Sequence, residues 1–178
     1  MKKTIVLLGY MGSGKSRVGK ALSQCIHIPY IDLDSYIEIQ EKSSIESIFN
    51  NKGEVYFRKK ERHYLEQLLL QKEPVILALG GGTPCYYDSM DFIVNSEVIS
   101  IYLKARINTL VSRLVNEKKR RPLISHLETE TDLQEFIGKH LFERLPFYSR
   151  ASHIIDVNLK SPEALSLKII KLAQINSV

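Results

Sequence analysis

The chain has 178 residues, of which 44% are hydrophobic and 25% are charged, so we expect a single domain spanning residues 1–178 that folds unaided. The formal net charge of +5 is compatible with binding to nucleic acid, and equally with binding to a nucleotide and an anionic small molecule. The sequence contains no apolar run of about 18 residues and no signal-like leader, so we expect a cytoplasmic protein without a membrane span.

Residues 9–16, Gly-Tyr-Met-Gly-Ser-Gly-Lys-Ser, match the phosphate-binding loop pattern G-x-x-x-x-G-K-[ST]. An apolar stretch at 4–8 precedes the loop and a helical pattern follows it, which is the strand–turn–helix context that the motif requires. The glycines allow the backbone to approach a polyanion, Lys15 offers a mobile ammonium to the β- and γ-phosphates, and the Ser16 hydroxyl reaches Mg²⁺. In the helix we expect Cys25 on the apolar face, as a small core residue.

Five apolar stretches predict strands at 4–8, 30–33, 75–79, 97–103 and 153–157, and helical patterns lie between them. Alternating strands and helices predict a three-layer α/β/α fold with a five-stranded parallel sheet. In such sheets, ligands bind at the edge formed by the carboxyl ends of the strands.

Asp32 and Asp34 follow the second strand, and alternation along a strand would place both carboxylates on one side. Beside a triphosphate they suit metal coordination and hydroxyl activation, whereas the alternative is a pair of turn and N-cap aspartates. Further on, Ser43 and Glu46 resemble a capping box that opens a helix, and Gly53 is a plausible helix end.

A longer helix is expected near residues 54–71, where Arg58 and Glu61 are spaced to form an i, i+3 ion pair. Surface ion pairs of this kind are common and weak, so the pair by itself indicates nothing. The third strand runs into Gly80-Gly81-Gly82, and three glycines at a strand end are typical of backbone that lies close to a ligand.

A helix predicted from about Arg106 to Leu114 leads into a basic loop, which we interpret as a mobile lid over residues 115–127 that carries Arg121. A further helix from about Asp132 reaches Arg144. After the last strand, residues 161–163, Ser-Pro-Glu, have the N-cap, proline and acidic first turn of a C-terminal helix.

Taken together, these residues resemble the shikimate kinase family over nearly the whole chain. The matching motifs are GYMGSGKS, Asp32-Leu33-Asp34, Phe57-Arg58 with Glu61, Gly80-Gly81-Gly82, Arg121-Pro122-Leu123 and Arg144-Leu145-Pro146-Phe147-Tyr148. The resemblance implies a fold like that of the nucleoside monophosphate kinases, with a helical substrate-binding region at about 33–62. It implies transfer of the ATP γ-phosphoryl group to the 3-hydroxyl of shikimate, a step of chorismate and aromatic amino acid biosynthesis.

The resemblance also implies roles for single residues. Lys15, Asp34 and Arg121 would be catalytic, and Ser16 and Asp32 would hold one Mg²⁺. ATP would be bound by Gly12, Ser13, Gly14, Lys15, Ser16, Arg17, Arg113, Arg121 and Pro162. Shikimate would be bound by Asp34, Arg58, Gly80, Gly81, Gly82 and Arg144. Many relatives carry a second hydroxyl residue where this chain has Arg17. We expect a monomer that acts on ATP and shikimate and binds neither nucleic acid nor membrane.

Three alternatives remain open. A kinase of the same fold could act on another small molecule, for example gluconate or a nucleoside monophosphate. A GTPase-like switch would need an Asp-x-x-Gly, which the sequence lacks, and its nearest guanine-binding match, Asn51-Lys52-Gly53-Glu54, ends in Glu. A basic nucleic-acid-binding module would bind with steep salt dependence.

Overall fold

The computed structural model describes residues 3–174, without the side chains of residues 119 and 120, and it contains one parallel sheet. The strands are β1 (Ile5–Leu8), β2 (Tyr30–Asp32), β3 (Ile76–Ala78), β4 (Ile99–Lys104) and β5 (His153–Asp156), in the order β2-β3-β1-β4-β5. All four neighbouring pairs are parallel. This confirms the predicted five-stranded sheet.

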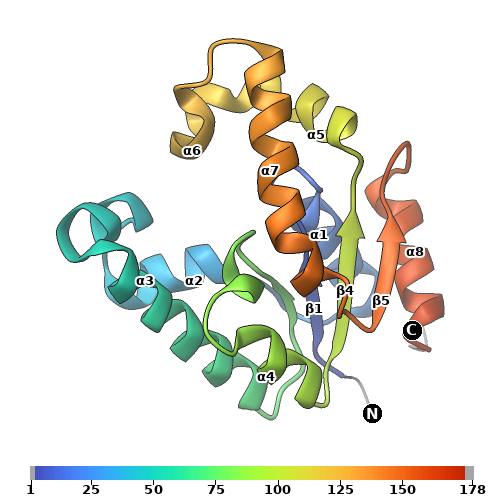
Figure 1. Ribbon diagram of the computed structural model, residues 1–178. Coiled ribbons are helices and arrows are strands. Elements are labelled where there is room, and N and C mark those ends of the chain that lie inside the picture. Colours follow the sequence, from blue (N-terminus) through green and yellow to red (C-terminus); the bar gives the residue numbers. More distant parts are fainter. Residues whose placement is uncertain (1–2, 175–178) are drawn as a thin grey trace.

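Helices connect the strands and cover both faces of the sheet (Figure 1). They are α1 (Lys15–Ile26), α2 (Leu33–Glu41), α3 (Ile45–Leu70), α4 (Ser89–Asn95), α5 (Ile107–Leu114), α6 (Pro122–Ser125), α7 (Glu130–Tyr148) and α8 (Pro162–Leu172). Two 3₁₀ helices, η1 (Thr83–Cys85) and η2 (Val115–Arg120), complete the fold. Within residues 3–174, no helix combines the length and the apolar character that a membrane crossing needs.

The central strand β1 is buried on both faces, as a parallel sheet between helices requires. Ile5 and Leu7 belong to one apolar cluster, together with residues of α1, α5, α7 and α8. Val6 and Leu8 belong to a second cluster, which α2, α3 and α4 complete. Because side chains alternate along a strand, one four-residue apolar stretch supplies both cores.

The first helix buries a narrower stripe than we expected. Val18, Leu22 and Ile26 are spaced four residues apart and are almost fully buried, whereas Cys25 is exposed. The prediction of Cys25 as a core residue was therefore wrong. Ile26, one position further along, occupies the core side of the last turn, and that rotates Cys25 toward solvent.

Helix α3 begins one residue later than the predicted capping box. Ser44, not Ser43, is the N-cap, and its hydroxyl accepts a hydrogen bond from the Ser47 amide at 3.2 Å. Gly53 has φ 79° and ψ 170°, so two helical segments meet there at a kink. The sequence correctly predicted a break at Gly53, because glycine adopts this conformation without a steric penalty.

The predicted lid corresponds to η2 and α6, which lie between α5 and α7. Lys118 Nζ donates to the carbonyl oxygens of Leu127 and Glu128 at 2.8 and 3.1 Å, and Ile124 of α6 is fully buried. Helix α7 then begins at Glu130, slightly before the predicted Asp132, because Thr129 and Asp132 form the capping box. The arrowheads of β1, β4 and β5 point toward the end of the molecule where α6 and the start of α7 lie (Figure 1), and β2 and β3 run parallel to them.

Candidate active site

The phosphate loop joins β1 to α1, and its backbone depends on glycine. Gly9, Gly12 and Gly14 have φ values of 145°, 78° and 100°, a region that other residues rarely adopt. A Cβ atom on Gly9 would also lie 2.8 Å from the carbonyl oxygen of Leu103. The loop ends at the first turn of α1, whose amide groups have no partner within the helix and therefore form an anion-binding surface.

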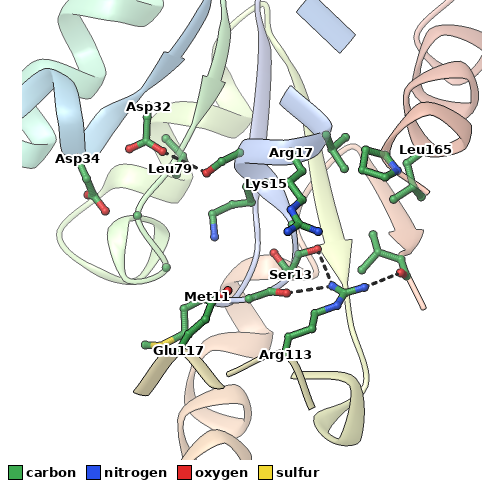
Figure 2. A pocket seen from close by; sticks show the side chains of 18 of the residues that line it. Met11, Ser13, Lys15, Arg17, Asp32, Asp34, Leu79, Arg113, Glu117 and Leu165 are labelled. Atoms are coloured by element: carbon green, nitrogen blue, oxygen red, sulfur yellow. Dashed lines mark hydrogen bonds between the residues drawn. The ribbon is translucent and has the colours of Figure 1, made fainter. Parts of the chain in front are cut away.

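Lys15 folds back over this loop. Its Nζ donates to the carbonyl oxygens of Gly9 at 2.8 Å and Tyr10 at 3.1 Å. Burial lowers the pKa of Lys15 to about 8, against the opposing effect of the Asp34 and Asp32 carboxylates. Figure 2 shows Lys15 extending into the cavity beside these two carboxylates. An anion bound beside the ammonium would favour its charged form and so oppose the effect of burial.

Asp32 ends strand β2 and caps helix α2. Its Oδ1 accepts from the Ser35 amide at 3.4 Å, and its Oδ2 accepts from the hydroxyls of Tyr30 at 3.2 Å and Ser16 at 3.5 Å. The N-cap interpretation is therefore correct for Asp32. The same carboxylate lines the cavity (Figure 2) and contacts the Ser16 hydroxyl, so the cap and the candidate metal site share one residue.

Asp34 lies in the first turn of α2 and not on the strand, so the alternation argument for the aspartate pair was wrong. The start of the helix, rather than the pleat of a strand, directs Asp32 and Asp34 into the same cavity. Burial raises the pKa of Asp34 to about 6, with Asp32 and Glu61 adding to the effect and Lys15 and Arg58 opposing it. The folded protein thus holds a carboxylate that is costly to ionise.

The three glycines after β3 contact side chains from three different helices. A Cβ on Gly80 would lie 2.9 Å from Oδ1 of Asp34, and one on Gly81 would lie 3.3 Å from Nη1 of Arg144. A Cβ on Gly82 would lie 3.1 Å from Nη1 and Nη2 of Arg58. The glycine run therefore brings the predicted substrate-binding residues of α2, α3 and α7 together. Larger residues would displace them.

Glu61 fixes the orientation of Arg58. Arg58 Nη1 donates to Oε2 of Glu61 at 2.8 Å, and the Thr83 hydroxyl donates to Oε1 at 2.6 Å. Glu61 is only 2% exposed, so the description of this contact as a weak surface ion pair was wrong. A signal was available in the sequence, because Glu61 falls on the apolar stripe of Phe57 and Leu65. An acidic residue at such a position requires a partner.

The far end of the cavity is formed by α5 and the start of α8. Arg113 Nη1 donates to the carbonyl oxygens of Gly12 at 2.9 Å and Ser13 at 3.3 Å, and its Nη2 donates to Val157 at 3.3 Å (Figure 2). Arg113 thus joins the phosphate loop to the segment after β5. Arg17 and Pro162 line the same end of the cavity.

The segment of η2 and α6 places Arg121 at the cavity, where it pairs with an acidic residue. Arg121 Nε and Nη2 donate to Oε2 of Glu117 at 2.9 and 2.6 Å, and both residues line the cavity. After burial, the positive charge of Arg121 also lowers the pKa of Lys15, whereas the two aspartates raise it. Sequence reasoning did not single out Glu117, because an acidic residue in a basic loop has no distinctive pattern.

The cavity has a volume of about 570 Å³, and most of the predicted site residues line it. Those that do are Gly12, Ser13, Gly14, Lys15, Ser16, Arg17, Asp32, Asp34, Gly80, Gly81, Arg113, Arg121 and Pro162. Arg58, Gly82 and Arg144 do not line it, although Arg144 lies next to Gly81, which does. Over residues 3–174, no group of three or more His, Cys, Asp or Glu side chains is placed to hold a metal ion.

A parallel sheet with a phosphate loop at its carboxyl edge, next to an arginine-rich second subsite, defines a phosphate-loop kinase of small molecules. The shikimate kinase family model matches residues 11–174. A shikimate kinase of Flavobacterium psychrophilum is 46% identical over 160 residues, which cover 90% of this chain and 92% of the relative. The chain belongs to the shikimate kinase family.

Solved structures of the family have the same fold. The crystal structure of shikimate kinase from Bacteroides thetaiotaomicron aligns with a TM-score of 0.90 and 33% identity, over 97% of this chain and 99% of that one. Shikimate kinase from Acinetobacter baumannii in complex with shikimate aligns with a TM-score of 0.85 and 30% identity, over 97% and 93% of the two chains.

Proposed function

We propose that this chain transfers the γ-phosphoryl group of ATP to the 3-hydroxyl of shikimate, giving ADP and shikimate 3-phosphate, a step of aromatic amino acid biosynthesis. The observation that carries the proposal is the meeting of Asp34, Arg58 and Arg144 at the glycine run, next to Lys15 of the phosphate loop. The related enzyme from Acinetobacter baumannii, whose structure contains shikimate, supports the choice of substrate.

In this proposal the phosphates of ATP bind at the amino end of α1. The amides of the loop and of the first helical turn surround the phosphates, and the Arg17 amide belongs to that turn whatever its side chain does. Lys15 leaves the Gly9 and Tyr10 carbonyls for the β- and γ-phosphates, and Arg121 leaves Glu117 for the transferring group. Phosphoryl transfer needs mainly positioning and positive charge, and these cations provide both.

The second subsite binds shikimate. Arg58 and Arg144 present planar forks that suit a carboxylate, and the Gly80–Gly82 backbone lies between them. Asp34 accepts hydrogen bonds from the hydroxyl groups of the substrate, including the attacking one. Its raised pKa makes it a better proton acceptor than an ordinary aspartate.

The residues next to the phosphate loop fit one Mg²⁺. Ser16 and Asp32 place a hydroxyl and a carboxylate 3.5 Å apart at the cavity wall. This small oxygen set is typical of Mg²⁺, which is held by one or two side chains together with phosphates and water. When bound with ATP, the ion neutralises negative charge on the phosphates.

Adenine is assigned to the opposite end of the cavity, between Arg113 and Pro162. Because three backbone carbonyls orient the Arg113 guanidinium, its flat face is held in a fixed plane. A fixed guanidinium face stacks on an aromatic base with little further loss of side-chain entropy.

A direct test couples ADP release to the addition of shikimate. We expect ADP release with shikimate and background rates with gluconate or a nucleoside monophosphate. A preference for either of those substrates would overturn the proposal in favour of another kinase of this fold. Nucleic-acid binding is tested by titration at two salt concentrations, and the expected monomer by size-exclusion chromatography with light scattering.

A further inference from the structure

Tyr86 covers Arg58, the arginine that the proposed function assigns to the substrate carboxylate. The Cζ atom of Arg58 lies 3.8 Å from the centre of the Tyr86 ring, which is direct cation–π contact. Tyr86 follows η1, and η1 is preceded by Gly82. One short segment therefore supplies both the glycine next to the Nη atoms of Arg58 and the aromatic ring over its face.

The two ion pairs of Arg58 use Nε and Nη1 and leave the Nη2 nitrogen for a ligand. Nε donates to Glu54 at 3.2 Å and Nη1 donates to Glu61 at 2.8 Å. Within residues 3–174, Nη2 makes no hydrogen bond to a carboxylate. The Arg58 side chain is 14% exposed, so its guanidinium is largely enclosed.

The two acidic partners of Arg58 lie on opposite sides of it along the helix, because Glu54 is one turn before Arg58 and Glu61 is one turn after it. The Tyr86 ring adds a contact of a different kind, because it lies against the face of the guanidinium and not at its edge. Tyr86 is itself tied to this group: burial raises the pKa of its hydroxyl, with a hydrogen bond to Glu54 as the next cause and Arg58 opposing.

We propose that Tyr86 is a positioning residue for the carboxylate subsite, and that its ring holds the plane of Arg58 so that Nη2 faces the anion. The proposal rests on the proposed function, because it refines how the same subsite recognises its substrate. It concerns affinity for shikimate and not phosphoryl transfer, since Tyr86 does not line the ATP cavity.

The test compares Tyr86→Leu with Tyr86→Phe and with Tyr87→Leu. Tyr87 is the matched control, because it is the neighbouring tyrosine, is 56% exposed and has no ring contact with Arg58 among the described residues. We expect Tyr86→Leu to raise the KM for shikimate about three- to tenfold, as loss of a partly exposed cation–π contact implies. The kcat and the KM for ATP should stay within about twofold, as should every parameter of Tyr86→Phe and Tyr87→Leu.

A second measurement separates positioning from general destabilisation. In an Arg58→Lys background, Tyr86→Leu should change the shikimate KM by less than about twofold, because no planar fork remains to be oriented. Should the leucine variant not fold, Tyr86→Gln gives the same comparison at a position that is 38% exposed.

Three results would overturn the inference. They are an unchanged shikimate KM in Tyr86→Leu, an equal rise in Tyr87→Leu, and the same fold-change whether Tyr86→Leu is made in the wild type or in the Arg58→Lys variant. Wild-type enzyme that releases no ADP with shikimate would instead refute the proposed function, and the inference with it. Wild-type turnover with an unaffected Tyr86→Leu variant refutes the inference alone.

Discussion

Ionised Asp34 is expected to lower the stability of the ligand-free protein at neutral pH. The Asp34→Asn variant should therefore be more stable than the wild type, and it should lose activity. Burial, with the Asp32 and Glu61 charges, raises the pKa of Asp34 from 3.8 to about 6. One pKa unit corresponds to about 1.4 kcal/mol, so the ionised carboxylate costs roughly 2–3 kcal/mol in the folded state. For a chain of this size that corresponds to a Tm gain of roughly 5–10 °C in the asparagine variant.

The gain should depend on pH in a defined direction. Above about pH 6, Asp34 is ionised in both the folded and the unfolded states, and the folded state bears the full cost. As the pH falls from about 6 to about 4, Asp34 becomes protonated in the folded state while it stays largely ionised in the unfolded state, so the cost disappears. The Tm difference between Asp34→Asn and wild type should therefore be largest at pH 7–8 and shrink toward pH 4–5.

Thermal melts of the ligand-free proteins from pH 4.5 to 8 measure this difference. Asp88→Asn is the control of opposite sign, because a hydrogen bond from Arg62 lowers the pKa of the exposed Asp88. Asp88 stabilises the fold above its unfolded pKa, so its asparagine variant should be less stable at neutral pH, with a loss that fades as the pH falls. A pH-independent gain for Asp34→Asn, or no gain, would refute the reasoning about Asp34.

Lys15→Ala should fold normally and lose turnover in the ADP-release assay, and near wild-type kcat would remove Lys15 from the mechanism. In wild type, kcat/KM for ATP should fall above about pH 8, where Lys15 of the ATP-free enzyme loses its proton. Arg121→Ala should lower kcat by up to about 10³-fold, more than it raises the shikimate KM, and the reverse order would contradict a role at the γ-phosphate. Arg58→Lys should reduce kcat/KM for shikimate about ten- to a hundredfold with little change for ATP, and equal losses for both substrates would contradict carboxylate binding. Glu61→Gln should raise the shikimate KM and lower the Tm, whereas unchanged values for both would show that the buried pair does not orient Arg58.

Local sequence predicted most of the architecture, and two of the errors occurred where neighbouring residues competed for the same position. Ser43 and Ser44 are both good N-caps, and the structure uses Ser44. Cys25 and Ile26 are both apolar, and helical geometry allows only Ile26 into the core. The register of a helix end depends on small differences between adjacent residues, which sequence patterns do not resolve.

The sequence alone determined the phosphate loop, the alternation of strands with helical segments and the parallel sheet, because these follow from glycine positions and apolar periodicity within short stretches. Tertiary structure decided what the site can do. The meeting of Asp34, Arg58 and Arg144 at the glycine run, and the burial of Glu61, join segments far apart in the chain. Their distances and pKa values depend on how α2, α3 and α7 pack against the sheet. That packing is a property of the whole fold, and no single stretch of sequence encodes it.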